Sequence, residues 1–292
     1  MKRGLLAGGI LLGCLLLVGG IAAADISTSG SVTFQINGNP AGLFSGSVSG
    51  KLSTSFSAAA DSWSGGLSAS IAGEGGTLSL RGAYIQYTAE MGSLKMQPLG
   101  VSYAIYDLGA NIASNPGVTL TATLEPLTLT TVINNADNGA GGVDWNYGIG
   151  GEYKTDLVTV GAKYNSNPAY GVQIVGAMDP ITLTGEYAGY QGGTAYLVKA
   201  VYALSRGKVT AKYTVKDAAY TGGTATTEIY GELAGFPITD TTTLKLTAKS
   251  TDGSTTFTGE TATTLAENVT LTLHLESAAG TLTYYGKVRI SF

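Results

Sequence analysis

Apolar and polar residues alternate along most of this chain, and no other feature restricts its fold so strongly. In the segment 269–276 the odd positions are apolar and the even positions are polar. The same alternation recurs in 26–36, 170–178, 181–189, 196–204, 209–215 and 282–292. Successive side chains of a β-strand point to opposite faces, so a period of two predicts strands with one apolar and one polar face. We expect an all-β chain of about 18 strands, with about 16 as the alternative, and no helix.

Two kinds of connection separate these segments. One kind is tight and lies at 125–126, 154–156, 179–180, 205–208 and 266–268. The other is longer, is richer in Gly and Asn, and lies at 107–117, 135–144, 165–169, 216–225 and 250–254. The two kinds largely alternate along the chain, so one edge of the sheet is expected to carry short turns and the other edge longer loops.

The stretch 77–106 departs from the regular pattern in two ways. Its apolar phase switches between 78–80 and 83–87, which predicts either a β-bulge or a different strand boundary. Pro98 is the only proline of the seven that falls outside a connection. A proline inside a strand removes a ladder hydrogen bond, so Pro98 predicts a kink.

Composition excludes several classes of protein. Charged residues make up 12% of the chain, against roughly 25% in an ordinary soluble domain. A hydrophobic fraction of 44% and a net charge of −4 exclude a disordered chain. After residue 24 no apolar run approaches the roughly 18 residues that a membrane-spanning helix needs. The acidic balance also argues against nucleic acid as a partner.

The first 24 residues have the pattern of a targeting segment. A basic start, Met1–Arg3, is followed by an apolar stretch over 4–21 and by three alanines ending at Ala24. This pattern predicts a cleaved signal peptide over 1–24 and a single mature domain over 25–292. The segment 11–14 loosely resembles a lipobox, which leaves lipidation of Cys14 as an alternative. If the signal peptide is instead cleaved after Ala24, Cys14 is removed with it, and the mature chain has no cysteine and no disulfide.

An alternating, all-strand chain with a signal peptide fits two environments. A soluble β-sandwich or a repetitive adhesin also alternates, but its outward face normally carries more charge. Here one face is mainly Thr and Ser, and the other is rich in Leu, Val, Ile, Tyr and Gly. Lipid offers no hydrogen bonds to the backbone, so strands can span it only as a closed barrel. We therefore predict a closed antiparallel transmembrane β-barrel surrounded by lipid.

Aromatic residues fit the same prediction. The chain has 17 Tyr and 2 Trp, and transmembrane barrels carry aromatic girdles at both membrane boundaries. Plain strand propensity, which also favours Tyr, is the alternative explanation. The residues assigned to the girdles lie near expected strand ends: Trp63, Trp145, Tyr153, Tyr164, Tyr170, Tyr187, Tyr190 and Tyr196.

With these features the chain resembles the outer-membrane porins of Gram-negative-type (diderm) bacteria. The resemblance lies in the signal segment, the Glu125-Pro126 and Asp179-Pro180 turns, and a final alternating strand that ends at Phe292. It implies short turns on the periplasmic side, longer loops on the outer side, and Phe292 as the signal read by the barrel-assembly machinery. It also implies an outer-membrane location and a homotrimer. A structural or surface-exposed envelope barrel or adhesin, without open-pore transport, is the alternative function.

Eighteen strands closed into a barrel enclose an interior too wide for side chains to fill, which predicts a water-filled pore for ions and small polar solutes. The alternation places ionisable side chains of both signs on the inner face, where they bias which ions pass. For each of these residues taken alone, the alternative explanation is that the side chain is simply solvated and has no effect on ion passage. The pore-lining candidates are Lys51, Arg81, Glu152, Lys163, Glu186, Lys199, Lys212, Glu228, Lys245, Glu260, His274, Lys287 and Arg289.

Porins of this class commonly fold the third outer loop into the pore, and here that loop is 107–117. Asp107, Asn111 and Asn115 are the polar residues expected at such a constriction. The loop lacks the acidic cluster that usually faces a basic ladder in the family, which leaves its charge selectivity open. The loop at 135–144 is about as long and is the alternative.

No enzyme is expected. His274 is the only histidine, and a hydrolase would also need a nucleophile and an orienting carboxylate that nothing in the sequence singles out. No Cys/His cluster suggests a transition-metal site, so neither a metal nor a cofactor is expected.

Overall fold

The computed structural model describes residues 24–38, 44–58, 62–72, 77–137 and 143–291. They form 18 strands: β1 (Ala24–Gly38), β2 (Phe44–Ala58), β3 (Trp63–Ala72), β4 (Thr77–Ala89), β5 (Gly92–Ile105), β6 (Gly109–Leu124), β7 (Leu127–Asp137), β8 (Val143–Lys154), β9 (Val158–Asn165), β10 (Ala169–Met178), β11 (Ile181–Tyr190), β12 (Gly193–Ala203), β13 (Lys208–Lys216), β14 (Thr226–Pro237), β15 (Thr242–Thr251), β16 (Ser254–Ala266), β17 (Val269–Ala278) and β18 (Thr281–Ser291). The expected all-β fold and the count of 18, rather than 16, are confirmed. The expected signal segment, Cys14 and Phe292 lie outside the described residues.

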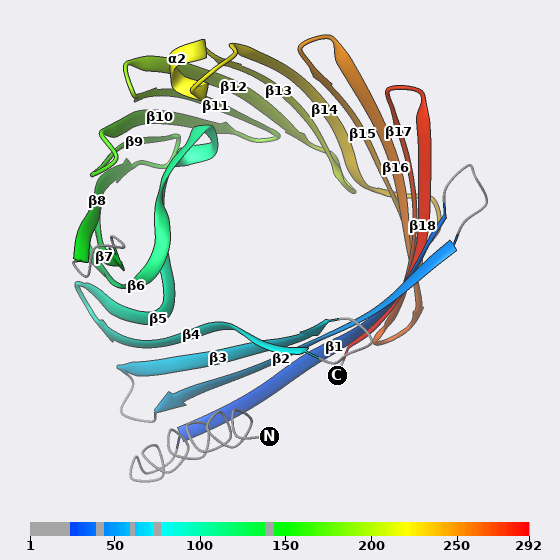
Figure 1. The fold of residues 1–292 in the computed structure, drawn as a ribbon, viewed down its shortest axis with the longest axis horizontal. Coiled ribbons are helices and arrows are strands. Elements are labelled where there is room, and N and C mark those ends of the chain that lie inside the picture. Colours follow the sequence, from blue (N-terminus) through cyan, green and yellow to red (C-terminus); the bar gives the residue numbers. More distant parts are fainter. Residues whose placement is uncertain (1–23, 39–43, 59–61, 73–76, 138–142, 292) are drawn as a thin grey trace.

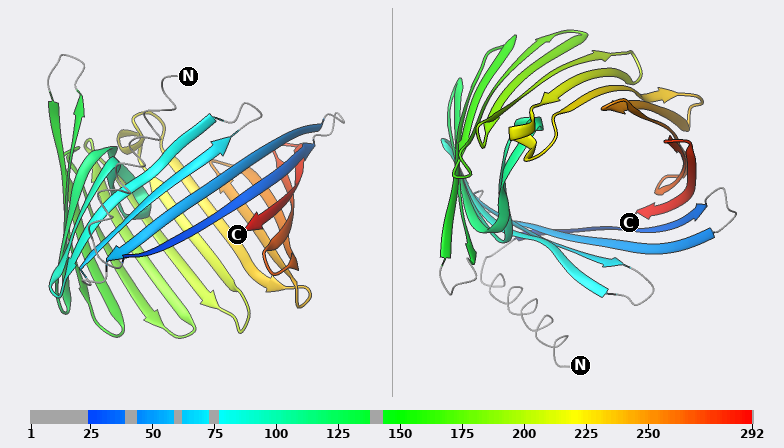
Figure 2. Two further views of the ribbon diagram at one scale, coloured as in Figure 1. Left: turned by 90° about the horizontal axis from the view of Figure 1, so that it is seen from below. Right: turned by 45° about the horizontal axis from the view of Figure 1, so that its top comes forward.

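All strands belong to one antiparallel sheet in which each strand pairs with its neighbours in the sequence. The first and last strands also pair, in register from Ser31–Ser291 to Gly38–Tyr284. The sheet curves strongly, so it has a convex and a concave side (Figure 1). Figure 2 shows that the strands are tilted relative to the axis around which the sheet curves.

The alternation in the sequence sorts residues between these two sides. On the convex side apolar side chains are exposed on strand after strand, as Ile174 at 55%, Val198 at 57% and Leu273 at 53% illustrate. The intervening residues point to the concave side and are largely Thr, Ser, Gly and ionisable residues. A period of two in the sequence has thus become two chemically different surfaces.

The phase switch near residue 80 is a bulge within one strand. Ser68 of β3 pairs with Gly82 of β4, whereas the next residue, Ala69, pairs with Leu80. Arg81 is therefore the extra residue, and every side chain beyond it changes face. The sequence predicted either a bulge or a different strand boundary here, and the bulge is the correct alternative.

The connections differ less between the two edges of the sheet than expected. Three connections at the edge predicted to have longer loops contain only two residues: Gln191–Gly192, Asp252–Gly253 and Ala279–Gly280. Both residues of each have positive φ, as in the type I′ turns that suit the twist of a β-hairpin. Much of the sequence expected to be loop, including most of 109–117, is instead paired strand.

Two short helical segments occur where none was expected. The 3₁₀ turn η1 (Tyr106–Leu108) connects β5 to β6, and α2 (Ala218–Thr221) lies between β13 and β14. The side chain of Asp217 caps α2 by accepting a hydrogen bond from the Tyr220 amide at 2.7 Å. Within the ranges described above, no helix is long and apolar enough to cross a membrane.

A row of tyrosines crosses the convex side of β8–β13, one on each strand. Tyr147 lies 6.3 Å from Tyr164, Tyr170 lies 6.4 Å from Tyr187, and Tyr196 lies 6.3 Å from Tyr213, measured between ring centroids. Tyr190 does not belong to this row. It points to the concave side and packs edge-on against Tyr220 at 5.9 Å, so its assignment to a girdle is corrected.

Candidate functional site

The connection between β5 and β6 folds into the concave side of the sheet. Regular pairing of the two strands ends at Gln97–Gly117, and register shifts follow at Val101 and Tyr103. This is where Pro98 predicted a kink. Beyond it the hairpin leaves the wall and runs inward to η1 at its tip (Figures 1 and 2). The segment 98–116 is called the inner hairpin below.

The base of the inner hairpin packs on β7. Val101, Tyr103 and Ile112 form a buried cluster with Val132 of β7. The side-chain amide Nδ2 of Asn134, also on β7, donates a hydrogen bond of 2.6 Å to the Val101 carbonyl. A buried polar group is stable only with a partner, so this bond fixes the point where the hairpin turns inward.

The tip of the inner hairpin packs further round the same wall. Ile105 and Leu108 are almost fully buried, at 0% and 1% exposure. Their cluster also contains Ala169 of β10, Ala188 of β11, Ala195 and Leu197 of β12, and Tyr220 of α2. The hairpin therefore covers the concave face from β7 to β12.

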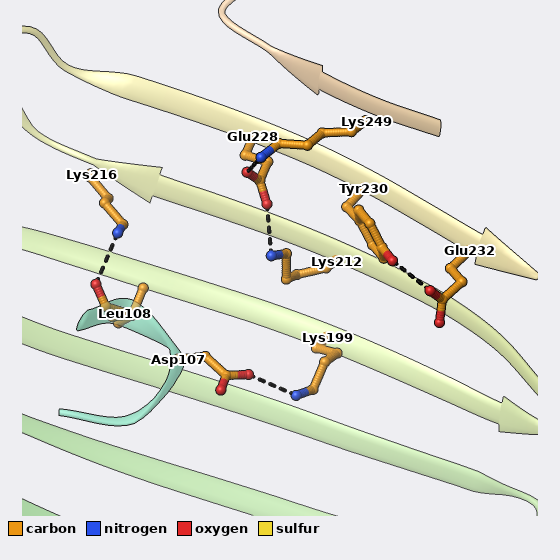
Figure 3. Close-up of polar contacts among 9 residues, drawn as sticks. All are labelled: Asp107, Leu108, Lys199, Lys212, Lys216, Glu228, Tyr230, Glu232 and Lys249. Atoms are coloured by element: carbon orange, nitrogen blue, oxygen red, sulfur yellow. Dashed lines mark hydrogen bonds and ion pairs between the residues drawn. The ribbon is translucent and has the colours of Figure 1, made fainter. Parts of the chain in front are cut away.

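Three polar contacts hold the tip in place, and a fourth, within the wall, orients one of their partners. The Asp107 amide donates to Glu186 Oε2 at 3.1 Å, and Gln173 Nε2 donates to Glu186 Oε1 at 2.7 Å. The Asp107 carboxylate forms an ion pair with Lys199 at 2.9 Å, and Lys216 Nζ donates to the Leu108 carbonyl at 2.9 Å (Figure 3). Both faces of the tip backbone are thus bound to the wall.

The β13–β14 loop closes over the tip from one side. The Tyr220 hydroxyl donates to the Leu108 carbonyl at 3.4 Å. Burial, with a smaller effect of Glu186, raises the pKa of Tyr220 to about 12, so the hydroxyl keeps its proton. Asp217 ties the loop to β12 by accepting from the Thr194 amide at 2.6 Å.

Glycines on the concave face leave room for the inner hairpin. A Cβ atom at Gly148 or Gly150 of β8 would collide with Tyr103, and one at Gly161 of β9 would collide with the Tyr106 hydroxyl. A Cβ at Gly171 of β10 would collide with the Ile105 side chain. Three neighbouring strands thus supply a bed of glycines at the positions where the hairpin lies.

Two charged residues next to this bed lie under the tip tyrosines. The Lys163 ammonium is 4.3 Å from the centroid of the Tyr106 ring and 5.5 Å from that of Tyr103. Such cation–π contacts attract an ammonium group to the face of an aromatic ring. Glu152, on β8, stays exposed.

Beyond the hairpin, β13–β15 carry lateral ion pairs on the concave face. Glu228 binds Lys212 at 2.7 Å and Lys249 at 2.8 Å, and Glu232 binds Lys245 at 2.9 Å. The Tyr230 hydroxyl also donates to Glu232, at 2.7 Å. Figure 3 shows Lys212, Glu228, Tyr230, Glu232 and Lys249 on the same side of the sheet as Asp107 and Lys199.

A third group lies on β16–β18. The His274 and Tyr285 rings stack with centroids 4.5 Å apart and planes 9° from parallel. Glu260 approaches His274 Nδ1 at 3.4 Å, and Glu276 approaches Nε2 at 3.8 Å. Cross-strand register places Lys245, Glu260, His274 and Tyr285 in one row on the concave face.

Eight of the thirteen residues predicted to line a pore fall into three settings. Lys163, Glu186 and Lys199 bind the hairpin; Lys212, Glu228 and Lys245 form ion pairs; Glu260 and His274 belong to the stacked cluster. Lys287 of β18 lies 6.0 Å from the Tyr285 ring centroid, and Arg289 is exposed. Lys51 pairs in register with Ser31 and Ser70, and Arg81 is the bulge residue of β4.

Of the three residues expected at a constriction, Asp107 lies at the hairpin tip. Asn115 pairs with Val101 in the register of β6 with β5, and its Nδ2 is buried without a hydrogen bond. Asn111 lies within β6. The inner hairpin also starts earlier in the sequence than the predicted 107–117, because its first strand includes Val101–Ile105.

Several residues of this site escaped the sequence analysis. Lys249 has the same parity as Lys245, so alternation alone could have placed it on the concave face. Lys216 has the same parity as Lys212, but it was assigned to a loop. Gln173 and Tyr220 carry no pattern that separates them from other polar or aromatic strand residues.

Comparison with known proteins shows a similarity in fold. No family model matches the chain, and no curated protein matches it. The structure of OpdO from Pseudomonas aeruginosa matches with a TM-score of 0.64 at 12% identity, over 93% of this chain and 97% of that chain. OpdQ from the same organism matches with a TM-score of 0.63 at 11% identity, over 92% and 97%. A mutant of Rh. blastica porin matches with a TM-score of 0.54 at 15% identity, over 92% and 100%. The chain shares the fold of these proteins along almost its whole length.

Proposed function

We propose that this chain is an outer-membrane porin, a closed transmembrane β-barrel with a water-filled pore through which ions and small polar solutes diffuse passively. The observation that carries the proposal is the contrast between its two surfaces. Exposed apolar side chains cover the convex side, whereas Lys, Glu, Thr and Ser face the concave side. Lipid suits the first surface and water the second.

Closure of the barrel is supported by the pairing of β1 with β18, which gives partners to both terminal strands. A spanning sheet without free edges satisfies its backbone hydrogen bonds internally. The fold shared with Rh. blastica porin supports the same arrangement. The row of tyrosines over β8–β13 is suited to one membrane boundary.

The inner hairpin is the proposed constriction of the pore. It occupies the concave side, and its tip carries Asp107 next to Lys199. Charges of both signs line the remaining wall, and those of Lys212, Glu228, Glu232, Lys245 and Lys249 form local ion pairs. We therefore expect a pore with a mild ion preference and no dedicated substrate, acting as a channel rather than as an enzyme.

The remaining elements of the proposal concern targeting and assembly. Residues 1–24 act as a signal peptide, and Phe292 is the residue that the barrel-assembly machinery recognises. The edge with the Glu125-Pro126 and Asp179-Pro180 turns faces the periplasm. The mature chain assembles as a homotrimer in the outer membrane of a Gram-negative-type bacterium. Mass analysis of the mature chain and of its detergent complex tests cleavage after Ala24 and the trimer.

Single-channel recording of the purified, detergent-folded protein in a planar bilayer tests the function. Discrete, long-lived conductance steps support an open pore, and a salt gradient gives its ion preference. Silence from protein that is folded and inserted contradicts the proposal. A structural or adhesive envelope barrel would then be the better explanation.

A further inference from the structure

The cluster around His274 differs from the other ionisable groups of the concave face. Glu228 and Glu232 are bound by lysines at 2.9 Å or less. Across the described ranges, no lysine or arginine lies within 4.0 Å of the carboxylates of Glu260 or Glu276. Each of these carboxylates instead approaches one ring nitrogen of His274, and Glu260 also accepts a hydrogen bond from the Tyr285 hydroxyl at 3.4 Å.

We propose that His274, held between Glu260 and Glu276, is a proton-controlled determinant of ion preference in the pore. This inference rests on the proposed porin function and deepens it. At neutral to alkaline pH the cluster carries the negative charges of two carboxylates that form no ion pair with a lysine or arginine, and it favours cations. At mildly acidic pH His274 gains a proton, cancels one of those charges and weakens the preference for cations.

The geometry of the imidazole supports this role. A neutral imidazole has one N–H, so one of its ring nitrogens presents a lone pair to a carboxylate. Here each ring nitrogen has a carboxylate of its own, at 3.4 Å and 3.8 Å, and Nδ1 has no hydrogen bond. Protonation gives both nitrogens an N–H and turns both contacts into charge-assisted ones.

The surroundings hold the ring but leave the cluster open to water. Stacking on Tyr285 fixes the plane of the imidazole. The His274 side chain is 17% exposed, while the side chains of Glu260 and Glu276 are 35% and 41% exposed. Protons and permeating ions can therefore reach the carboxylates.

Every charged or titratable group packed around His274 can be named. Glu260 faces it from β16, Tyr285 faces it from β18, and Glu276 is two residues along its own strand. Lys287 lies beyond Tyr285 on β18. Lys245 is the register partner of Glu260 on β15; its ammonium forms an ion pair with Glu232 and acts on Glu260 electrostatically without an ion pair.

His274 is the single histidine of the chain, and histidine is the side chain that ordinarily changes charge between about pH 5 and 8. The test is the reversal potential of single channels in a KCl gradient at about pH 8 and about pH 5.5. We expect the cation-to-anion permeability ratio to fall about twofold at the lower pH, because the added charge lies within about one Debye length of the ion path.

Three variants make the test specific. His274→Gln removes the titrating group and should abolish the change between the two pH values. Glu276→Gln should lower the cation preference at the higher pH. Glu228→Gln is the matched control, because it shifts the preference at both pH values but leaves the pH-dependent change intact.

A second readout does not depend on conduction. With one histidine, the imidazole ¹⁵N signals of labelled protein in micelles are unambiguous, and they should report a change of protonation between about pH 8 and about pH 5.5. An imidazole that keeps one protonation state, or a His274→Gln channel with an unchanged pH response, overturns the inference. Folded protein that conducts at no pH overturns the porin proposal itself, and the inference falls with it.

Discussion

The concave face of this protein is built differently where the inner hairpin covers it and where it is bare. Under the hairpin, β8–β12 carry glycines and alanines: Gly148, Gly150, Gly161, Ala169, Gly171, Ala188 and Ala195. On β14–β18 the corresponding positions carry long polar and aromatic side chains, among them Tyr230, Lys245, Glu260, His274 and Tyr285. In the first region Glu186 and Lys199 bind the hairpin, whereas in the second Glu228 and Glu232 bind lysines of neighbouring strands.

This difference shows what an inward-facing position has to satisfy. A wall that packs against a second layer of protein needs space close to its backbone, and glycine provides it. A wall that faces water has to fill the space with solvated groups, and long charged side chains do so. Residue size at inward positions therefore records which part of the wall is covered.

Gly171→Leu should have the largest effect on the covered part of the wall, because it places a branched side chain where Ile105 and the Tyr187 backbone lie. Overpacking of this kind costs about 1–3 kcal/mol. We expect the inner hairpin to be displaced, with larger and less steady single-channel currents and faster proteolysis of the hairpin. Both are measured on folded protein, in a planar bilayer and in detergent.

Gly176→Leu is the control for this experiment. Gly176 lies on the same strand, β10, and a Cβ there meets nothing within 4 Å. That variant should behave like the unmodified protein. Equal effects of the two substitutions would show that the glycine bed does not hold the hairpin.

Glu186→Ala tests the polar anchor of the tip rather than its packing. Glu186 is 4% exposed and accepts hydrogen bonds from the Asp107 amide and from Gln173. Losing hydrogen bonds to a charged acceptor costs about 1–3 kcal/mol. At about 1.4 kcal/mol per tenfold, hydrogen exchange of the Asp107 amide should accelerate by about five- to a hundredfold.

Glu152→Ala provides the matched control, because Glu152 points to the same side of the sheet but is exposed. Its removal should leave exchange at the tip unchanged. Slow exchange of the Asp107 amide in Glu186→Ala would mean that packing of Ile105 and Leu108 alone fixes the tip.

Glu228→Gln probes the bare half of the wall, where we expect function to change more than stability. Ion pairs that remain in contact with solvent contribute roughly 0–1 kcal/mol. Unfolding in denaturant should therefore shift by less than about 1 kcal/mol. Lys212 and Lys249 lose their shared partner, so the reversal potential should move toward anion preference. A large loss of stability with no change in reversal potential would show that these pairs are structural.

Alternation was sufficient to predict the strands and the two faces, because a period of two is a local property of the backbone; near Arg81 it indicated either a bulge or a different strand boundary. It was not sufficient to separate the inner hairpin from the wall. Val101, Tyr103 and Ile105 alternate like any other strand, and only their long-range partners show that they leave the sheet. For the same reason the expected loop, 107–117, began too late.

The positions of the glycines within the strands are a further signal in the sequence, beyond their contribution to the composition. Gly148, Gly150, Gly161 and Gly171 all fall at inward positions of three neighbouring strands, which indicates a covered wall. Tyr190 was misassigned because its nearness to a strand end outweighed its parity. The pairing of charges across strands, such as Glu232 with Lys245, depends on a register that the sequence does not display.

The smallest effect concerns the loop that closes over the hairpin tip. Hydrogen bonds from the amides of Tyr220 and Thr194 hold the pKa of Asp217 below its ordinary value. A carboxyl group whose pKa is lowered by folding stabilises the folded loop when the pH is above the pKa of that group in the unfolded chain, about 3.9. This stabilisation is lost as the pH falls through the pKa of the group in the folded loop.

We therefore expect the β13–β14 loop to stay docked from neutral pH down to about pH 4 and to loosen below it. Amide exchange at Tyr220, corrected for the intrinsic effect of pH, measures this loosening. Asp217→Asn keeps a capping oxygen but cannot titrate, so it should flatten the pH dependence, whereas Asp217→Ala should loosen the loop at every pH. If Asp217→Asn loosens at the same pH as the unmodified protein, another group controls the loop. Glu186, which lies beneath the same tip, would then be the next carboxylate to substitute.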